Sequence, residues 1–128
     1  MKPRSILIAA MMAVVVGGVI FASRQATRIV TIPPPSPAAQ AGQQAFGRNC
    51  ASCHGERVQG TPMGPPLVHS TYRSEHHPDA AFERAVRLGV RAHHRSRGHM
   101  PPQPAVTPPE VGEITRYIRE LQHANGIR

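Results

Sequence analysis

The sequence predicts an all-α fold, in which three main helices form one small domain behind an N-terminal transmembrane helix. Apolar residues recur at helical spacing in residues 39–49, 79–88 and 107–123, as expected for helices that each bury one face. No pattern of strands is visible around them. The chain has no Trp, three Phe and two Tyr, so a domain of about 90 residues needs a staple such as a metal or a cofactor.

Residues 1–24 are expected to be a membrane anchor. Residues 6–22 form an uncharged run of seventeen residues, at the short edge of a membrane-spanning helix and longer than the usual core of a signal peptide. The end of this run offers only a poor cleavage site, at Ile20 and Ala22. We therefore expect an uncleaved helix, with a cleaved signal sequence as the alternative.

Residues 25–37 are predicted to be a proline-rich linker. Residues 32–37 read Ile-Pro-Pro-Pro-Ser-Pro, and each proline fixes its own backbone torsion and restricts the residue before it. We expect an extended, semi-rigid spacer that holds the folded domain, residues 38–128, off the membrane by a few turns of polyproline.

Residues 50–54 read C-A-S-C-H, the C-x-x-C-H attachment motif of c-type haem. The thiols of Cys50 and Cys53 can each add to one vinyl group of the porphyrin, and His54 is then placed under the iron as an axial ligand. A thioredoxin-like dithiol, a zinc site and an accidental pair of buried cysteines are competing interpretations. No βαβ pattern surrounds the cysteines, and no second ligand pair follows at zinc spacing. We therefore predict one covalently attached haem c.

Residues 79–88 are predicted to form the middle helix, with Gly89 as its stop. Phe82, Ala85 and Val86 share one face, and arginines occupy the other. This helix begins the most basic part of the domain, which contains Arg84, Arg87, Arg91, Arg95 and Arg97.

A capping box is expected at the start of the last helix. Thr107 and Glu110 are placed to satisfy free amides, and the prolines between them suit the first turn. The helix should run to about His123 and end at Asn125-Gly126. Its apolar stripe is Ile114, Tyr117, Ile118 and Leu121.

The chain from about residue 38 to residue 122 resembles a mono-haem, class I c-type cytochrome of bacteria. Beside C-A-S-C-H, the resemblance rests on Gly64-Pro65-Pro66-Leu67, on Met100-Pro101-Pro102, and on Gly42 and Phe46, which lie where the family packs its first helix on its last. It implies a cytochrome c-like fold of three main helices around one covalent haem. It also implies that the Pro65 carbonyl accepts a hydrogen bond from the ring of His54, and that Met100 binds the iron as the sixth ligand.

Other residues compete for the sixth position. Met63 lies only nine residues after His54, and we expect it in a loop on the same side of the ring. The histidines His93, His94 and His99 lie close to Met100 in sequence, so histidine ligation stays open. The pair His76-His77, together with His93-His94, could also hold a transition metal, although solvated side chains are the simpler interpretation.

The resemblance implies an electron carrier rather than an enzyme, with iron cycling between the ferric and ferrous states. Haem of this type is attached outside the bacterial inner membrane, so we expect a single-pass protein whose haem domain faces the periplasm. A soluble periplasmic protein, formed by cleavage, is the alternative. Other functions that stay open are a haem subunit of a dehydrogenase or oxidase complex, a haem sensor and a histidine-rich metal-binding protein.

The net charge of the chain is +8, but much of it flanks the leader. From residue 33 onward, 11 basic and 7 acidic residues give +4. This modest surplus predicts redox partners with acidic docking surfaces. No basic patch is interleaved with aromatic residues, so we do not expect nucleic-acid binding.

Overall fold

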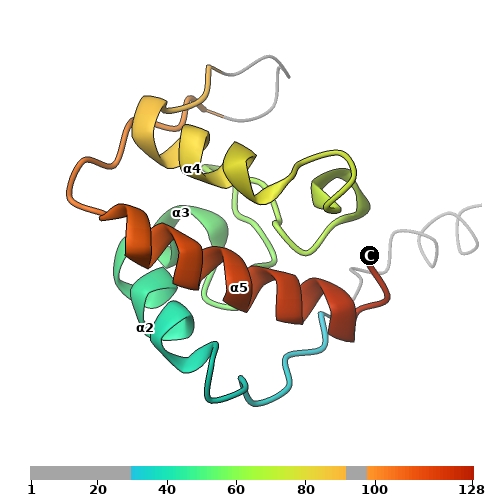
Figure 1. Cartoon of the computed structure of the whole chain (residues 1–128). Helices are drawn as coiled ribbons and strands as arrows, with labels where there is room; N and C mark the ends of the chain where they lie inside the picture. Colours follow the sequence, from blue (N-terminus) through green and yellow to red (C-terminus); the bar gives the residue numbers. More distant parts are fainter. Residues whose placement is uncertain (1–29, 92–97) are drawn as a thin grey trace, which may run out of the picture.

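The computed structural model describes residues 30–91 and 98–128, which form a helical domain (Figure 1). Its helices are α2 (Gln40–Asn49), α3 (Ala51–His54), α4 (Asp79–Leu88), α5 (Pro108–Ala124) and the short 3-10 helix η1 (Ser70–Tyr72). The three predicted main helices are confirmed as α2, α4 and α5. The short α3 and η1 were not predicted. Extended pairing within the described residues is limited to one isolated bridge, between Val90 and Met100.

Helices α2 and α5 cross in close contact at Gly42. A Cβ atom on this residue would lie 2.0 Å from the backbone oxygen of Glu113 and 3.1 Å from the Cβ of Tyr117. Beside the crossing, the rings of Phe46 and Tyr117 have centroids 5.9 Å apart and are tilted by 57°, a favoured arrangement of two aromatic rings. The first and last helices of the domain therefore pack together as the resemblance implied.

The predicted capping box is present at the start of α5. The Thr107 amide donates to the Glu110 carboxylate over 3.0 Å, and the Glu110 amide donates to the Thr107 hydroxyl over 3.5 Å. These bonds satisfy two amides that the helix itself leaves unpaired. The bond from the Thr107 amide, followed by that from its hydroxyl, holds the pKa of Glu110 below its ordinary value.

Helix α4 ends at Gly89, whose φ of 71° favours glycine. The chain then leads through residues 92–97, which are not described, to Met100. Val90 and Met100 exchange backbone hydrogen bonds of 2.9 and 3.0 Å, and the Gln103 amide donates to the Val86 carbonyl over 2.8 Å. These bonds attach Met100 to the end of α4.

Arg119 on α5 holds α4 and the segment before it in place. Its guanidinium donates to the Asp79 carboxylate over 2.9 Å, to the Tyr72 carbonyl over 2.7 Å and to the His77 carbonyl. It also lies 5.1 Å from the centre of the Phe82 ring. Because this side chain is only 13% exposed, its charged hydrogen bonds are stronger than those of a surface arginine.

Residues 30–38, which we call the strap, lie on the domain instead of projecting from it. The Asn125 side chain donates to the Thr31 carbonyl over 2.8 Å and accepts from the Thr31 amide over 2.9 Å. The Ser36 amide and hydroxyl both donate to the Glu120 carboxylate. Residues 31–36 form no helix, strand or turn. The attachment to α5 was not anticipated, because prolines restrict a segment without indicating which surface it contacts.

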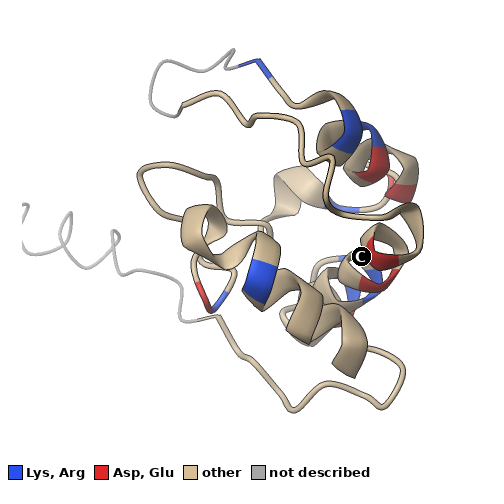
Figure 2. Ribbon diagram, turned by 90° about the vertical axis from the view of Figure 1, so that its left-hand side faces the viewer, with Lys and Arg blue, Asp and Glu red and all other residues tan. Residues whose placement is uncertain are grey.

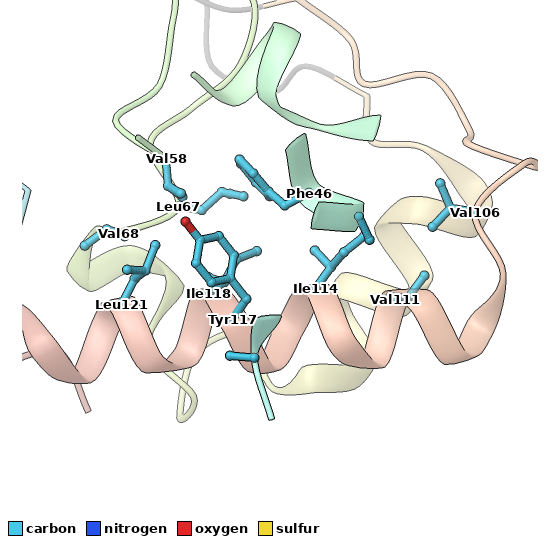
Figure 3. Close-up of a cluster of buried hydrophobic side chains, with 12 residues drawn as sticks. Phe46, Val58, Leu67, Val68, Val106, Val111, Ile114, Tyr117, Ile118 and Leu121 are labelled. Atoms are coloured by element: carbon cyan, nitrogen blue, oxygen red, sulfur yellow. The ribbon is translucent and has the colours of Figure 1, made fainter. Parts of the chain in front are cut away.

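The hydrophobic core lies along α5 (Figure 3). Helix α5 contributes Val111, Ile114, Tyr117, Ile118 and Leu121, while other segments contribute Ala39, Ala45, Phe46, Val58, Leu67, Val68 and Val106. Only two of these are aromatic, in line with the scarcity of aromatic residues in the sequence. The core is therefore small, and several of its side chains also face the cleft described below.

The predicted anchor, residues 1–24, and the first part of the predicted linker lie outside the described residues. Among the helices found in residues 30–91 and 98–128, none combines the length and the apolar character required to cross a membrane.

Candidate functional site

A cleft of about 840 Å³ lies between α3, α4 and α5. Its apolar lining includes Phe46, Leu67, Phe82, Val86, Ile114 and Ile118. Cys50, His54 and Met100 line the same cleft, although Met100 comes 46 residues after His54. Cys53 lies in α3, directly before His54, but it is not among the residues that line the cleft.

The C-A-S-C-H motif folds as one helical turn after α2. The amides of Cys53 and His54 donate to the Cys50 carbonyl over 3.2 and 2.9 Å. Residues four apart in a helix share a face, so this turn directs both Cys50 and His54 toward the cleft. Gly55, with φ of 82°, ends the turn.

The ring of His54 is oriented by the Pro65 carbonyl, as the resemblance implied. Nδ1 of His54 lies 2.9 Å from the Pro65 oxygen, and because a carbonyl only accepts, Nδ1 carries the proton. The lone pair of the neutral ring is then on Nε2, the nitrogen that can bind a metal. His54 is buried, with 9% of its surface exposed.

The close approach of the Pro65 segment to His54 depends on Gly64 and Thr61, whose roles were not predicted from the sequence. A Cβ atom on Gly64 would lie 2.7 Å from the Cys53 oxygen and 3.1 Å from Nδ1 of His54. The Thr61 hydroxyl donates to the Cys53 carbonyl and accepts from the Gly64 amide over 3.3 Å. A threonine shortly before a Gly-Pro pair is a turn signal that could have indicated this loop.

The structure separates the two candidate methionines. Met63 is 66% exposed in the loop between Thr61 and Gly64, and it is not among the described residues of the cleft. Met100 is partly buried and lines the cleft with His54. His99 is exposed, whereas residues 93–94 lie outside the described part of the chain.

A polar edge of the cleft, formed by His69, Thr71, Tyr72 and His77, was not predicted. His77 donates from Nδ1 to the Thr71 carbonyl over 2.7 Å, while Nδ1 of His69 accepts from the Thr71 amide over 3.2 Å. Within the described residues, no three His, Cys, Asp or Glu side chains gather so that they could hold a metal ion. The surface metal site considered for His76-His77 therefore gains no support from this part of the chain.

Cys50 and Cys53 are not joined in a disulfide. Burial, followed by the nearby charge of Cys53, raises the pKa of Cys50 to about 11. Without an attached group, Cys50 would therefore be a neutral thiol at neutral pH. A thioether bond to each sulfur requires no disulfide to be broken first.

The residues of the cleft fit the predicted haem. Apolar walls suit the porphyrin, and the nitrogen of an imidazole and the sulfur of a thioether are established ligands of haem iron. The Thr115 hydroxyl gives a further indication, because it is 3% exposed, lines the cleft and has no hydrogen-bond partner among the described residues. A buried hydroxyl of this kind is usually satisfied by water or a bound group.

Comparison with known protein families matches the Cytochrome c model to residues 39–122. The matched range holds the C-A-S-C-H motif, Pro65, Met100 and nearly all of the three main helices. Searches of curated proteins and of solved structures found no match. Since the family match covers more than half of the chain, the chain belongs to the cytochrome c family, and it is a haem-based electron carrier with a covalently bound haem c.

Proposed function

We propose that this chain is a mono-haem, class I cytochrome of a bacterial inner membrane, and that it passes single electrons between periplasmic or membrane redox proteins. One observation carries the proposal: Cys50 and His54 come from one helical turn, Met100 comes from a segment 46 residues after His54, and all three line one apolar cleft. This set combines an attachment point for a porphyrin with two side chains able to bind its iron.

Each residue of the site has a distinct role in this proposal. Cys50 and Cys53 would hold the porphyrin by thioether bonds, while Nε2 of His54 and Sδ of Met100 would bind its iron. The bound haem supplies a one-electron ferric/ferrous couple. A methionine ligand stabilises the ferrous state and raises the potential relative to a second histidine. The Pro65 carbonyl fixes the orientation and the basicity of the imidazole.

The partners proposed from the sequence are redox proteins with acidic docking surfaces. Support comes from α4 and the segment after it, where Arg84, Arg87 and Arg91 are exposed and where Figure 2 shows basic positions. Arg84 and Arg91 also line the cleft. An acidic surface would therefore be attracted to the part of the domain that contains the haem.

The proposed location combines the family with the leader. Cytochrome c domains are typically periplasmic or extracellular, and the apolar run at residues 6–22 is the candidate anchor. A soluble periplasmic carrier, produced by cleavage of residues 1–24, is the alternative. Separation of membranes from the periplasmic fraction, followed by sequencing of the N-terminus, distinguishes the two.

The sixth ligand is tested by comparing Met100→Ala with Met63→Ala, a matched methionine outside the cleft. Met100→Ala should abolish the methionine-to-iron charge-transfer absorption of the ferric protein. It should also lower the midpoint potential by on the order of a hundred millivolts. Met63→Ala should change neither property. An unchanged spectrum of Met100→Ala would refute Met100 as the ligand, and extraction of the haem into acidified organic solvent would refute the thioether attachment.

A second candidate function is that of a haem subunit fixed in a dehydrogenase or oxidase complex. Leu88 and Val90, at the end of α4, are 61% and 38% exposed, and Figure 1 places the end of α4 away from the strap. Both residues line the cleft, so a haem would cover part of their surface, and the part left uncovered at the rim is a candidate subunit interface. Stoichiometric co-purification of an oxidoreductase from native membranes would favour this function over that of a free carrier.

A further inference from the structure

The strap and the surface that binds it limit how far the domain can move from a membrane. We propose that the strap keeps the haem domain on a short tether, so that its redox partners present their donor or acceptor groups close to the bilayer surface. This inference rests on the proposed membrane anchor at residues 6–22.

Polar contacts hold the strap at two separate points on α5. Asn125 pairs with both backbone groups of Thr31, through bonds of 2.9 and 2.8 Å. Five residues earlier, on α5, the Glu120 carboxylate accepts from the Ser36 amide over 3.1 Å and from its hydroxyl. A segment held at two such points cannot swing as a free linker does.

Further contacts cover both ends of the strap. Val30 and Ile32 are partly buried against the hydrophobic core. At the first residue, Arg57 donates to the Val30 carbonyl over 3.3 Å. At the last, Arg116 donates to the Ala38 carbonyl over 3.2 Å. The chain is therefore bound to the domain from residue 30 onward, whereas the predicted spacer ended at residue 37.

The point of exit sets the reach of the tether. Between the apolar run and the strap lie residues 23–29, seven residues, which span at most about 25 Å when fully extended. With the strap released, the tether would comprise residues 23–38, sixteen residues, and could span about 55 Å. Binding of the strap thus cuts the maximal reach by about half.

The position of the first residue of the strap, Val30, relative to the cleft determines which partners can reach the haem. The strap begins beside the C-terminal end of α5, whereas the connection that carries Met100 leads into the N-terminal end (Figure 1). The 17 residues of α5 correspond to a helix about 25 Å long. The Met100 side of the cleft therefore stays within about 50 Å of the bilayer, which favours membrane-bound partners over distant soluble ones.

The test uses the full-length, haem-loaded protein in phosphatidylcholine vesicles that contain a spin-labelled headgroup. Because both native cysteines are bound to the haem, Ala124→Cys provides a single thiol for a nitroxide near the exit. With the haem reduced, pulsed electron paramagnetic resonance measures distances from this label to the headgroups. Hydrogen exchange of the Thr31 and Ser36 amides reports separately whether the strap is bound.

Two variants release the strap in different ways. Glu120→Ala with Asn125→Ala removes the polar contacts on α5. Val30→Ser with Ile32→Ser weakens the apolar contacts from the strap itself, and so leaves α5 intact. Glu113→Gln, elsewhere on the same helix, is the control.

In the parent and the control, the shortest label-to-headgroup distances, which report the height of the label above the bilayer, should not exceed about 30 Å. The Thr31 and Ser36 amides should be protected from exchange. In both release variants, exchange should accelerate at least about tenfold, and molecules whose shortest label-to-headgroup distance is beyond about 40 Å should appear. Rapid exchange in the parent, or equal distances in the parent and the variants, would overturn the short tether. If the protein does not float with the vesicles, the anchor itself is refuted, while hydrogen exchange still decides whether the strap binds.

Discussion

The contact between α2 and α5 predicts opposite effects for two glycine substitutions in one helix. At Gly42, an added Cβ would lie 2.0 Å from the backbone oxygen of Glu113 and 2.5 Å from its carbonyl carbon. Neither backbone atom can rotate away, so the helices must separate. Overpacking of this kind costs about 1–3 kcal/mol, and the short distance argues for the upper end. The better helix propensity of alanine stabilises the helix by up to about 1 kcal/mol. Gly42→Ala should therefore lower the free energy of unfolding by about 2 kcal/mol.

Gly47 provides the matched control, since it lies in the same helix and is exposed. No described atom lies within 4 Å of a Cβ added there. Gly47→Ala should therefore show the propensity gain alone, about 0.5–1 kcal/mol of added stability. The two variants should differ by about 3 kcal/mol.

Urea unfolding of the haem-loaded protein measures this difference. Because the haem is covalently attached, it stays with the unfolded chain, so cofactor concentration does not enter the comparison. With a slope of about 1–3 kcal/mol/M for a small domain, the two midpoints should differ by about 1–3 M. Equal midpoints would show that α2 and α5 do not meet at Gly42, and would refute the packing on which the fold depends.

Three further predictions concern buried or charged groups. Arg119→Ala should destabilise the protein by about 3–5 kcal/mol in urea unfolding, because it removes a largely buried charge and leaves its partners unpaired. Arg116→Ala, on the exposed side of α5, should cost less than about 1 kcal/mol. Similar costs for the two variants would contradict the role assigned to Arg119. Because the pKa of Glu110 is lowered, the stability that its carboxylate contributes is present above the ordinary pKa of 4.5 and is lost as the pH falls through the pKa of the folded state. Glu110→Gln should thus be less stable than the parent at neutral pH and equal to it in acid. A difference that persists in acid would argue against the capping carboxylate. Before haem attachment, the raised pKa of Cys50 predicts that its alkylation, followed by mass spectrometry, accelerates with pH up to about 11, whereas a plateau near pH 9 would show that the thiol is not buried.

The features that could be predicted from the sequence are those encoded by short-range spacing. The C-A-S-C-H motif, the capping box at Thr107 and the stop at Gly89 each depend on residues within a few positions of one another. The helices α2, α4 and α5 followed from apolar periodicity, and Pro65 and Met100 followed from their resemblance to family motifs. Local chemistry of this kind does not depend on the remainder of the fold.

The features that were missed depend on contacts between distant segments. Arg119 resembles Arg116 in sequence, because both are basic residues on one helix, yet only Arg119 faces α4 and is mostly buried. The strap was predicted to be extended, but its partners Glu120 and Asn125 come about ninety residues later. Sequence spacing alone does not determine which polar side chain such a segment will contact.

The two halves of the domain differ in what holds them together. Helices α2 and α5 pack directly through Gly42, Phe46 and Tyr117, so protein contacts alone join them. In the described structure α4 has no buried residue, and its apolar side chains Phe82 and Val86 line the cleft. Because amphipathic helices gain most of their stability by covering an apolar face, α4 depends on the porphyrin and on its link to α5. The haem is thus both the redox group and the missing part of the core, which explains how so few aromatic residues suffice for this fold.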